Sequence, residues 1–380
     1  MAVDTSQDLI ATIYDGEGPV DETITVALPY CDLPPSLAAL GCHSRTLAQA
    51  TRATPDSPAD LPVSVRAWDA CWVDLTSVRV AAIQAVPVIL DLEGCVEKAE
   101  RLVRAAAAEG AQLAVLPECF VPIYPMSRLT HSNWDSRQTD LFEQMWLNSV
   151  EVPGPVVDRL SALCLELGVH IAVGVNEREP ERSGSLYNTL LLLGPDGLLH
   201  KHRKLMPTNH ERLFHAIGSG DDLTAVQTPL GRIGGLLCWE NFMPLARYAV
   251  YRQRPQIWLA PTMDDGDRWP SLVRTIAWEA GAWVVSVCGF ARRSDYPDGL
   301  SVVPDDGPDL FTRGGSMIVA PNGEVVAGPL YDEEGILFAD CDLRATVRAK
   351  YGFDSVGHYG REEAILGTLE RARTASERRS

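Results

Sequence analysis

Three residues with chemically reactive side chains stand where predicted strands end. Cys238 closes the run GGLLC directly before WENFMP, Glu118 follows AVLP, and Lys204 ends HKHRK. Open α/β sheets bind ligands at the carboxyl ends of their strands, and a cysteine near a helix start has a favoured thiolate. These positions suit a nucleophile at 238, a general base at 118 and a cation at 204. The simpler alternatives are a buried thiol, a salt-bridged or helix-capping glutamate, and a solvated basic patch.

The basic cluster that contains Lys204 also includes two histidines. His200 and His202 would lie on the same face of a strand, but no third metal ligand follows in a regular pattern. None of the nine cysteines forms the CxxC pair that a zinc site or a thioredoxin-like motif would need. We therefore expect no metal site.

Composition narrows the class of protein. The 380 residues include 46% hydrophobic and 22% charged residues, and the formal net charge is −18. This acidity argues against nucleic acid or an anionic membrane as a partner, because both need a basic face. No run approaches the ~20 apolar residues of a membrane-spanning helix. The start has no basic segment followed by an apolar run, and the odd number of cysteines favours free thiols, so we expect a cytoplasmic protein.

Residues 1–77 differ from the remainder in composition. They contain seven prolines, no lysine, three arginines and eleven acidic residues. The segments PP at 34–35 and TPDSPADLP at 54–62 are typical of loops, although residues 36–53 could form a helix. We interpret residues 1–77 as an N-terminal extension; the alternative is a small docked subdomain. Residues 361–380 form a C-terminal tail, and we expect its polar end, ERARTASERRS, to be irregular.

From Val78 onward, apolar strands alternate with amphipathic helices. Helices are expected over 92–109, 139–149, 154–168, 244–254 and 269–282. Single strands are expected over 78–90, 112–117, 169–175, 256–261, 283–288, 315–321, 324–329 and 335–341, and hairpins over 187–205 and 225–238. Apolar strands need helices to cover them, and the hairpins make the sheets mixed, so the pattern predicts an α/β sandwich.

Taken together, the three reactive segments resemble the nitrilase branch of the carbon–nitrogen hydrolase superfamily. LPECF resembles the segment with the catalytic glutamate, HRKLMPT the lysine segment, and GGLLCWEN the nucleophile segment. The resemblance extends over residues 78–360 and includes GGSMIVAPNGEVVAGPLYDEEGILFADCDL and FDSVGHYGR. It implies an α-β-β-α sandwich with two mixed sheets, in which Glu118, Lys204 and Cys238 are the catalytic residues.

The resemblance also implies a reaction. Cys238 would attack the carbon of a nitrile to give a thioimidate, Glu118 would transfer protons, and Lys204 would stabilise the tetrahedral intermediates. An acyl-enzyme would then be hydrolysed, so that the products are a carboxylic acid and ammonia, with no cofactor. Glu211, in PTNHERL, matches a second glutamate that supports the lysine and the nucleophile.

The residues that follow Cys238 separate the possible activities. CWEN is the form seen in nitrilases proper, so the expected partner is a small nitrile. The main alternative is an amidase or carbamoyl hydrolase with the same catalytic set; a thiol-dependent acyltransferase and a non-catalytic scaffold are further alternatives. The resemblance implies a homodimer or a larger spiral homo-oligomer. We expect its interface on the helices near 244–254 and 269–282, which are apolar on more than one face.

The substrate pocket is expected to include the loop 121–138, which follows Glu118. This loop departs from the more aromatic run that many nitrilases have there, so the resemblance does not indicate which nitrile is preferred. The candidate substrate-binding residues, each of which could instead belong to the core, are Tyr124, Trp134, Trp239, Phe242, Pro261 and Thr262.

Overall fold

The computed structural model describes residues 77–377, apart from 133, 180, 182–183, 299, 301–302 and 304–307, together with two short strands nearer the N-terminus. The chain divides into two units, Met1–Trp72 and Val73–Ser380. In the first unit, β1 (Ile10–Ala11) pairs antiparallel with β2 (Ile24–Thr25). The possible helix over 36–53 and the proline-rich segments lie outside the described residues. The interpretation of residues 1–77 as an extension therefore stays a prediction.

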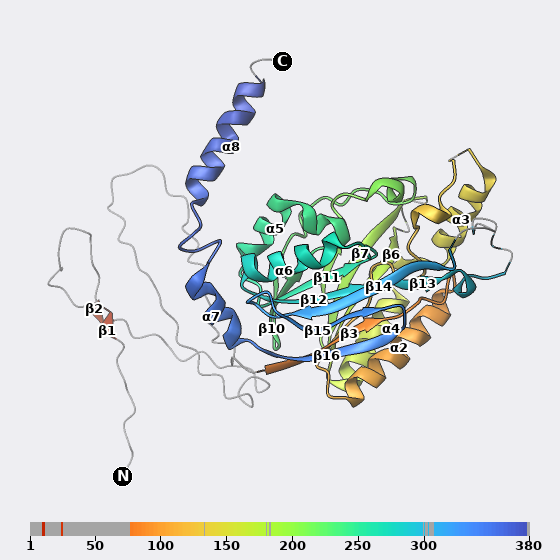
Figure 1. Ribbon diagram of the computed structural model, residues 1–380, viewed down its shortest axis with the longest axis horizontal. Helices are drawn as coiled ribbons and strands as arrows, with labels where there is room; N and C mark the ends of the chain where they lie inside the picture. Colours follow the sequence, from red (N-terminus) through yellow and green to blue (C-terminus); the bar gives the residue numbers. More distant parts are fainter. Residues whose placement is uncertain are drawn as a thin grey trace, which may run out of the picture. The chain divides into compact units, whose positions relative to one another are not determined.

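Two seven-stranded mixed sheets form the centre of the second unit (Figure 1). The first sheet has the order β16-β3-β4-β6-β7-β8, with β5 paired to β6, and the second has the order β13-β14-β12-β11-β10-β9, with β15 paired to β14. The strands of the first sheet are β3 (Ser77–Gln84), β4 (Leu113–Val115), β5 (Val150–Glu151), β6 (His170–Arg178), β7 (Leu186–Gly194), β8 (Gly197–Arg203) and β16 (Gly335–Asp342). Those of the second are β9 (Val226–Thr228), β10 (Gly231–Gly235), β11 (Ile257–Thr262), β12 (Trp283–Cys288), β13 (Phe290–Arg292), β14 (Leu310–Val319) and β15 (Val325–Tyr331).

Helices cover the outer faces of both sheets (Figure 1). The helices α2 (Leu92–Ala108) and α4 (Pro155–Leu167) share an apolar cluster with the first sheet, and α5 (Pro244–Tyr251) and α6 (Arg268–Ala280) share one with the second. A further cluster, with Val80, Leu113 and Val285 among its members, lies between the sheets. The predicted α-β-β-α sandwich with two mixed sheets is therefore confirmed. Both predicted hairpins, β7–β8 and β9–β10, are also present.

Local sequence explains several element ends. The side chain of Asp91 accepts a hydrogen bond from the N–H of Gly94 and begins α2. Pro155 occupies the first turn of α4, and Gly168, with φ of 68°, ends that helix. The strand expected over 78–90 ends at Gln84, because Pro87 lacks an N–H and Leu90 has a positive φ of 58°.

The C-terminal part contains helices that the sequence analysis did not predict. They are α7 (Arg344–Gly352) and α8 (Glu362–Glu377), so the expectation of an irregular end is wrong up to Glu377. Within α8, Arg373 pairs with Glu370 at 2.7 Å, three residues earlier, and such pairs support a helix that is polar on most of its surface. Among the described residues, no helix combines the length and apolar character needed to cross a membrane.

Candidate active site

The three reactive residues follow strands of both sheets. Glu118 lies three residues beyond β4, Lys204 directly follows β8, and Cys238 begins the short helix η3 (Cys238–Phe242), three residues beyond β10. Two glycines allow this close packing. A Cβ at Gly174 would lie 2.5 Å from the backbone N of Cys119, and one at Gly235 would lie 2.2 Å from the carbonyl oxygen of Leu259. The loop that carries Glu118 and the strand that leads to Cys238 therefore approach neighbouring backbone as only glycine permits.

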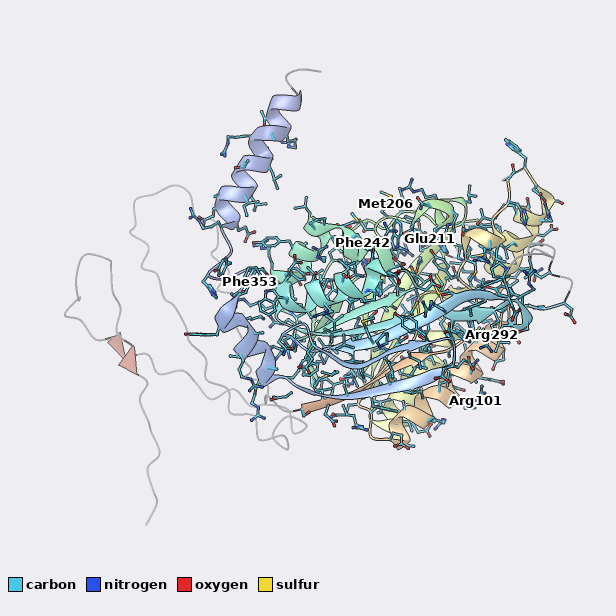
Figure 2. All side chains as sticks on the ribbon, viewed as in Figure 1. Arg101, Met206, Glu211, Phe242, Arg292 and Phe353 are labelled. Carbon is cyan, nitrogen blue, oxygen red and sulfur yellow. The ribbon has the colours of Figure 1, made fainter. Side chains whose placement is uncertain are left out.

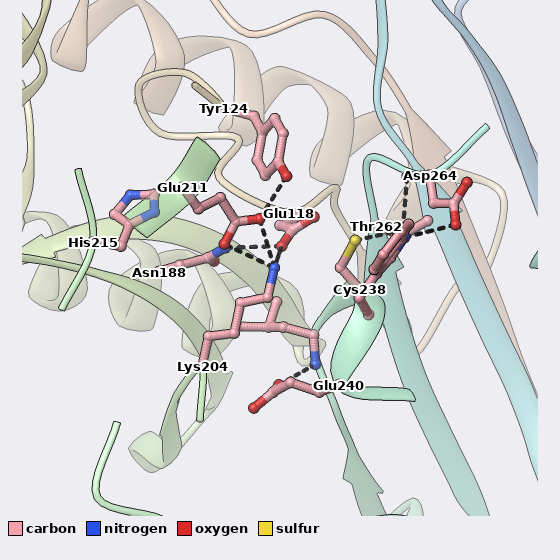
Figure 3. Close-up of polar contacts among 12 residues, drawn as sticks. Glu118, Tyr124, Asn188, Lys204, Glu211, His215, Cys238, Glu240, Thr262 and Asp264 are labelled. Atoms are coloured by element: carbon pink, nitrogen blue, oxygen red, sulfur yellow. Dashed lines mark hydrogen bonds and ion pairs between the residues drawn. The ribbon is translucent and has the colours of Figure 1, made fainter. Parts of the chain in front are cut away.

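Lys204 bridges two carboxylates in the interior (Figure 3). Its Nζ lies 2.7 Å from Oε1 of Glu118 and 2.7 and 2.9 Å from the two oxygens of Glu211. All three side chains are fully buried. The hydroxyl of Tyr124 donates to Oε1 of Glu211 at 2.5 Å, and Nδ2 of Asn188 donates to Oε1 of Glu118 at 2.8 Å. The other oxygen of Glu118, Oε2, has no hydrogen-bond partner, which leaves it able to accept a proton.

Burial and charge set different protonation states for these groups. Burial raises the pKa of Glu118, although the positive charge of Lys204 opposes that shift. Burial would also raise the pKa of Glu211, but the positive charge of Lys204 outweighs this effect, so the pKa of that carboxyl is lowered. Burial would lower the pKa of Lys204, yet the facing acidic groups raise it well above its usual value, so the lysine stays cationic. The arrangement holds one permanent ion pair, Lys204–Glu211, beside a carboxyl whose proton affinity suits general base catalysis.

Cys238 faces this cluster from the second sheet. Figure 3 shows its side chain pointing toward Glu118, and its Sγ accepts a hydrogen bond from Oγ1 of Thr262 at 3.1 Å. Burial and the charge of Glu118 raise the pKa of the Cys238 thiol well above its usual value. The resting group is therefore a neutral thiol, and a base must remove its proton for it to act as a nucleophile. The backbone at Cys238 has a positive φ of 48°, the left-handed region that favours glycine.

A cavity of about 310 Å³ opens onto Cys238. It brings together Cys238 and two of the predicted substrate-binding residues, Tyr124 and Trp239. Asp264 also lines the cavity, and its Oδ2 accepts a hydrogen bond from Nε1 of Trp239 at 2.8 Å. The remaining lining residues are Met126, Ser127, Arg128, Thr208, Asn209, His210, Met263, Asp265, Phe311 and Thr312.

The other predicted substrate-binding residues do not line this cavity. Trp134 is 91% exposed, because the turn that it occupies leads outward into α3 (Ser136–Leu147), which Asp135 caps. Phe242, labelled in Figure 2, lies at the end of η3 and packs edge-on against the rings of Trp239 and Trp269. Pro261 is buried within β11, and Thr262 contacts the sulfur of Cys238 from behind the cavity wall.

Sequence reasoning missed a group next to the nucleophile, formed by the buried residues His202 and Glu240 and the partly exposed Asp222, which we call the His202 clamp. Nε2 of His202 lies 3.0 Å from Glu240 Oε2, and its Nδ1 lies 2.9 Å from Asp222 Oδ1. Glu240 also accepts the N–H of Leu237, at 2.8 Å, and that of Leu205. The clamp therefore joins the backbone beside Cys238 to the backbone beside Lys204. Its signal in the sequence was Glu240 within CWEN, a charged residue directly after an apolar run.

Asn188 was also missed, although it and Thr189 are polar residues in the mainly apolar strand β7. Asn188 holds Oε1 of Glu118, and Oε2 has no hydrogen-bond partner. Within the described part of the chain, no group of three or more His, Cys, Asp or Glu side chains is arranged to hold a metal ion.

The known sequences that resemble this chain agree on its family. Residues 79–351 match the family model described as carbon–nitrogen hydrolase. An aliphatic nitrilase from Sinorhizobium fredii is 42% identical over 295 residues, which is 77% of this chain and 95% of that protein. A bifunctional nitrilase/nitrile hydratase from Lupinus angustifolius is 40% identical over 316 residues, covering 80% of this chain and 89% of that protein.

Solved structures share the fold at low sequence identity. A carbon–nitrogen hydrolase from Helicobacter pylori has 18% identity and a TM-score of 0.61, covering 77% of this chain and 98% of that chain. Nit3 of Saccharomyces cerevisiae, a member of the nitrilase superfamily, has 22% identity and a TM-score of 0.59, covering 75% of this chain and 97% of that chain. These structures agree with the sandwich described above.

Proposed function

Because this chain belongs to the carbon–nitrogen hydrolase family, we propose that it is a nitrilase, which converts an organic nitrile and two waters into a carboxylic acid and ammonia. One observation carries the proposal: the buried ion pair of Lys204 with Glu118 and Glu211 lies beside a thiol at the end of a cavity. The relatives named as nitrilases, at about 40% identity, support nitriles rather than amides as substrates.

The first half of the reaction forms the covalent intermediate. The thiol proton of Cys238 passes to Oε2 of Glu118 while the sulfur electron pair forms the bond to the nitrile carbon. One C–N π bond breaks, and its electron pair takes the proton back from Glu118 at nitrogen, which gives a thioimidate. Lys204 and the backbone N–H of Trp239 stabilise the charge that develops on the reacting atoms. Glu211 and Tyr124 hold Lys204 in place for this step.

The second half releases ammonia and the acid. Water adds to the thioimidate carbon as Glu118 takes one of its protons and passes it to nitrogen, which gives a tetrahedral intermediate with a hydroxyl and an amino group. Glu118 then moves the hydroxyl proton to the amino nitrogen, the C–N bond breaks, and ammonia departs to leave a thioester. A second water attacks the resulting thioester, the C–S bond breaks, and the proton returns to the sulfur of Cys238. Glu118 is unchanged after each half because it donates every proton that it accepts.

Assembly and location are part of the same proposal. We expect a homodimer or larger homo-oligomer through α5 and α6, where Leu245 and Trp278 are 67% and 54% exposed. Light scattering after size-exclusion chromatography would contradict this if it found only a 41.5 kDa species at micromolar concentration. A cytoplasmic location is supported by the six described cysteines, which are all free thiols.

A screen for ammonia and acid release tests the activity. Aliphatic, aromatic and arylacetonitriles are each compared with the corresponding amide, and Cys238→Ala serves as the control. Turnover of at least one nitrile that exceeds its amide, and that disappears in Cys238→Ala, is expected. Turnover of amides alone would favour the amidase alternative, and no turnover of either class would contradict the proposal.

A further inference from the structure

Thr262 ends the strand β11, and Cys238 follows the neighbouring parallel strand β10. Gly235 of β10 pairs with Leu259 of β11, and Cys238 and Thr262 each stand three positions after these paired residues. The side chain of Thr262 is fully buried, so water does not compete for its hydroxyl. Its Oγ1 lies 3.1 Å from the sulfur of Cys238, within hydrogen-bond distance for sulfur.

The direction of this hydrogen bond follows from the second contact of the same hydroxyl. The backbone N–H of Asp264 donates to Oγ1 of Thr262 at 2.9 Å. A threonine hydroxyl has one proton, and with an N–H directed at its lone pair, that proton is free to point at the sulfur. Thr262 therefore presents a fixed donor to Sγ, and the loop after β11 holds it in that orientation.

The charges around the sulfur make such a donor useful. Glu118 and Glu211 both disfavour a thiolate at Cys238, and Lys204 is the cation that favours it. Tyr124, Cys119 and Cys288 also face the sulfur, but burial raises the pKa of each, so they remain neutral. Asp264 and Asp265 add negative charge along the cavity wall. Arg128 also lines this wall, so the four carboxyl groups outnumber the two cations, Lys204 and Arg128.

We propose that Thr262 is a catalytic residue, whose hydroxyl stabilises the thiolate of Cys238 by donating a hydrogen bond to it. The inference rests on the nucleophilic role of Cys238 in the proposed function, but not on which substrate is used. The Thr262 proton is not transferred: the thiol proton goes to Glu118, and the Thr262 O–H bond stays intact while the S–C bond forms. This role replaces the contact with substrate that the sequence analysis expected of Thr262.

Alkylation of Cys238 by iodoacetamide tests the proposal without a nitrile, because the thiolate is the reacting species and iodide leaves as the S–C bond forms. Labelling at Cys238 is followed by peptide mass spectrometry from pH 6 to pH 10. Thr262→Val keeps the shape of the side chain and removes the donor. A hydrogen bond to a charged group is worth about a factor of ten or more, so the labelling rate of Thr262→Val is expected to be about tenfold below that of the wild type throughout this pH range. Thr262→Ser retains the donor and is expected to stay within about threefold of the wild type.

Thr228→Val is the matched control. Oγ1 of Thr228 accepts the N–H of Leu230, two residues later, and donates to a carbonyl oxygen, so this variant removes a buried hydroxyl with the same backbone contact far from the sulfur. Its alkylation profile is expected to match the wild type. If Thr262→Val does not fold, Thr262→Ala is compared with Thr262→Ser in its place.

Two results would overturn the inference. One is a wild-type alkylation profile for folded Thr262→Val; the other is a Thr262→Ser variant as slow as Thr262→Val, which would mean that the methyl group and not the hydroxyl matters. If the wild type hydrolyses no nitrile but Thr262→Val is alkylated more slowly than the wild type as expected, the proposed function fails and the role of Thr262 stands.

Discussion

His202 carries a buried positive charge whose effect on stability can be measured through pH. Burial alone would lower the pKa of His202, but the charge of Glu240 and the hydrogen bonds to Asp222 and Glu240 outweigh it and raise the pKa to about 10, from 6.5. Both ring nitrogens face carboxylates, and only the imidazolium can donate to both. The side chain of His202 is almost fully buried, so solvent screens these contacts little.

The sign of the effect follows from the raised pKa. Below pH 6.5 the histidine is charged in both the folded and the unfolded chain, and its contribution to the free energy of unfolding is complete. Between pH 6.5 and 10 the unfolded chain loses this proton first, and the contribution declines until it vanishes above pH 10. A rise of this size corresponds to about 5 kcal/mol at ~1.36 kcal/mol per pH unit.

Replacing His202 by glutamine removes the titrating group. Urea unfolding, followed by tryptophan fluorescence at pH 6.5, 8 and 10, measures the difference in free energy of unfolding between wild type and His202→Gln. We expect a difference of about 3–5 kcal/mol at pH 6.5 that shrinks toward zero at pH 10. The control is His200→Gln, two residues earlier on β8, where burial lowers the histidine pKa and leaves it neutral across this range. A difference for His202→Gln that stays constant from pH 6.5 to pH 10 would refute a charged His202.

Three further predictions address the active site and the chain ends. Cys238→Ala should lose nitrile turnover and keep its circular dichroism spectrum, because the covalent route needs the thiol; activity within tenfold of wild type would exclude Cys238 as nucleophile. Asn188→Leu removes a hydrogen bond that lowers the pKa of Glu118, so the acid limb of the kcat/KM profile should move upward by about one pH unit, and an unmoved limb would contradict the contact. Deleting residues 1–70 should leave a soluble, active protein, since their composition offers few apolar faces; an insoluble product would show that they belong to the core or an interface.

The positions of Glu118, Lys204 and Cys238 at strand ends could be predicted from the sequence, because Glu118 and Cys238 follow short apolar runs and Lys204 stands at the end of a hairpin. The alternation of apolar strands with helices also predicted mixed sheets covered by helices. Side-chain directions in the loops were not accessible in this way. Trp134 was predicted to line the pocket from its residue type, but the cap at Asp135 turns the chain and exposes the indole ring.

Asn188 shows how one irregularity hides a functional contact. At the turn, Gly194 pairs with Gly197 and Leu193 with Leu198, a register that would place Asn188 opposite Arg203. A bulge between Leu192 and Leu193 shifts the pairing by one residue, so the backbone of Asn188 accepts the N–H of Lys204 at 2.7 Å. A shift of one residue exchanges the two faces of a strand. The bulge therefore places Lys204 opposite Asn188, on the face where both side chains reach Glu118, and the apolar pattern does not reveal it.

The left-handed backbone at Cys238 has a consequence for how this protein would change once its activity was no longer selected. A residue other than glycine held at a φ of 48° costs of order 1 kcal/mol, which the fold bears to present the sulfur. Without that demand, glycine at position 238 would relieve the cost and leave the two sheets untouched. Urea unfolding of Cys238→Gly beside Cys238→Ala would reveal this, since equal stabilities would mean that the turn at 238 stores no strain.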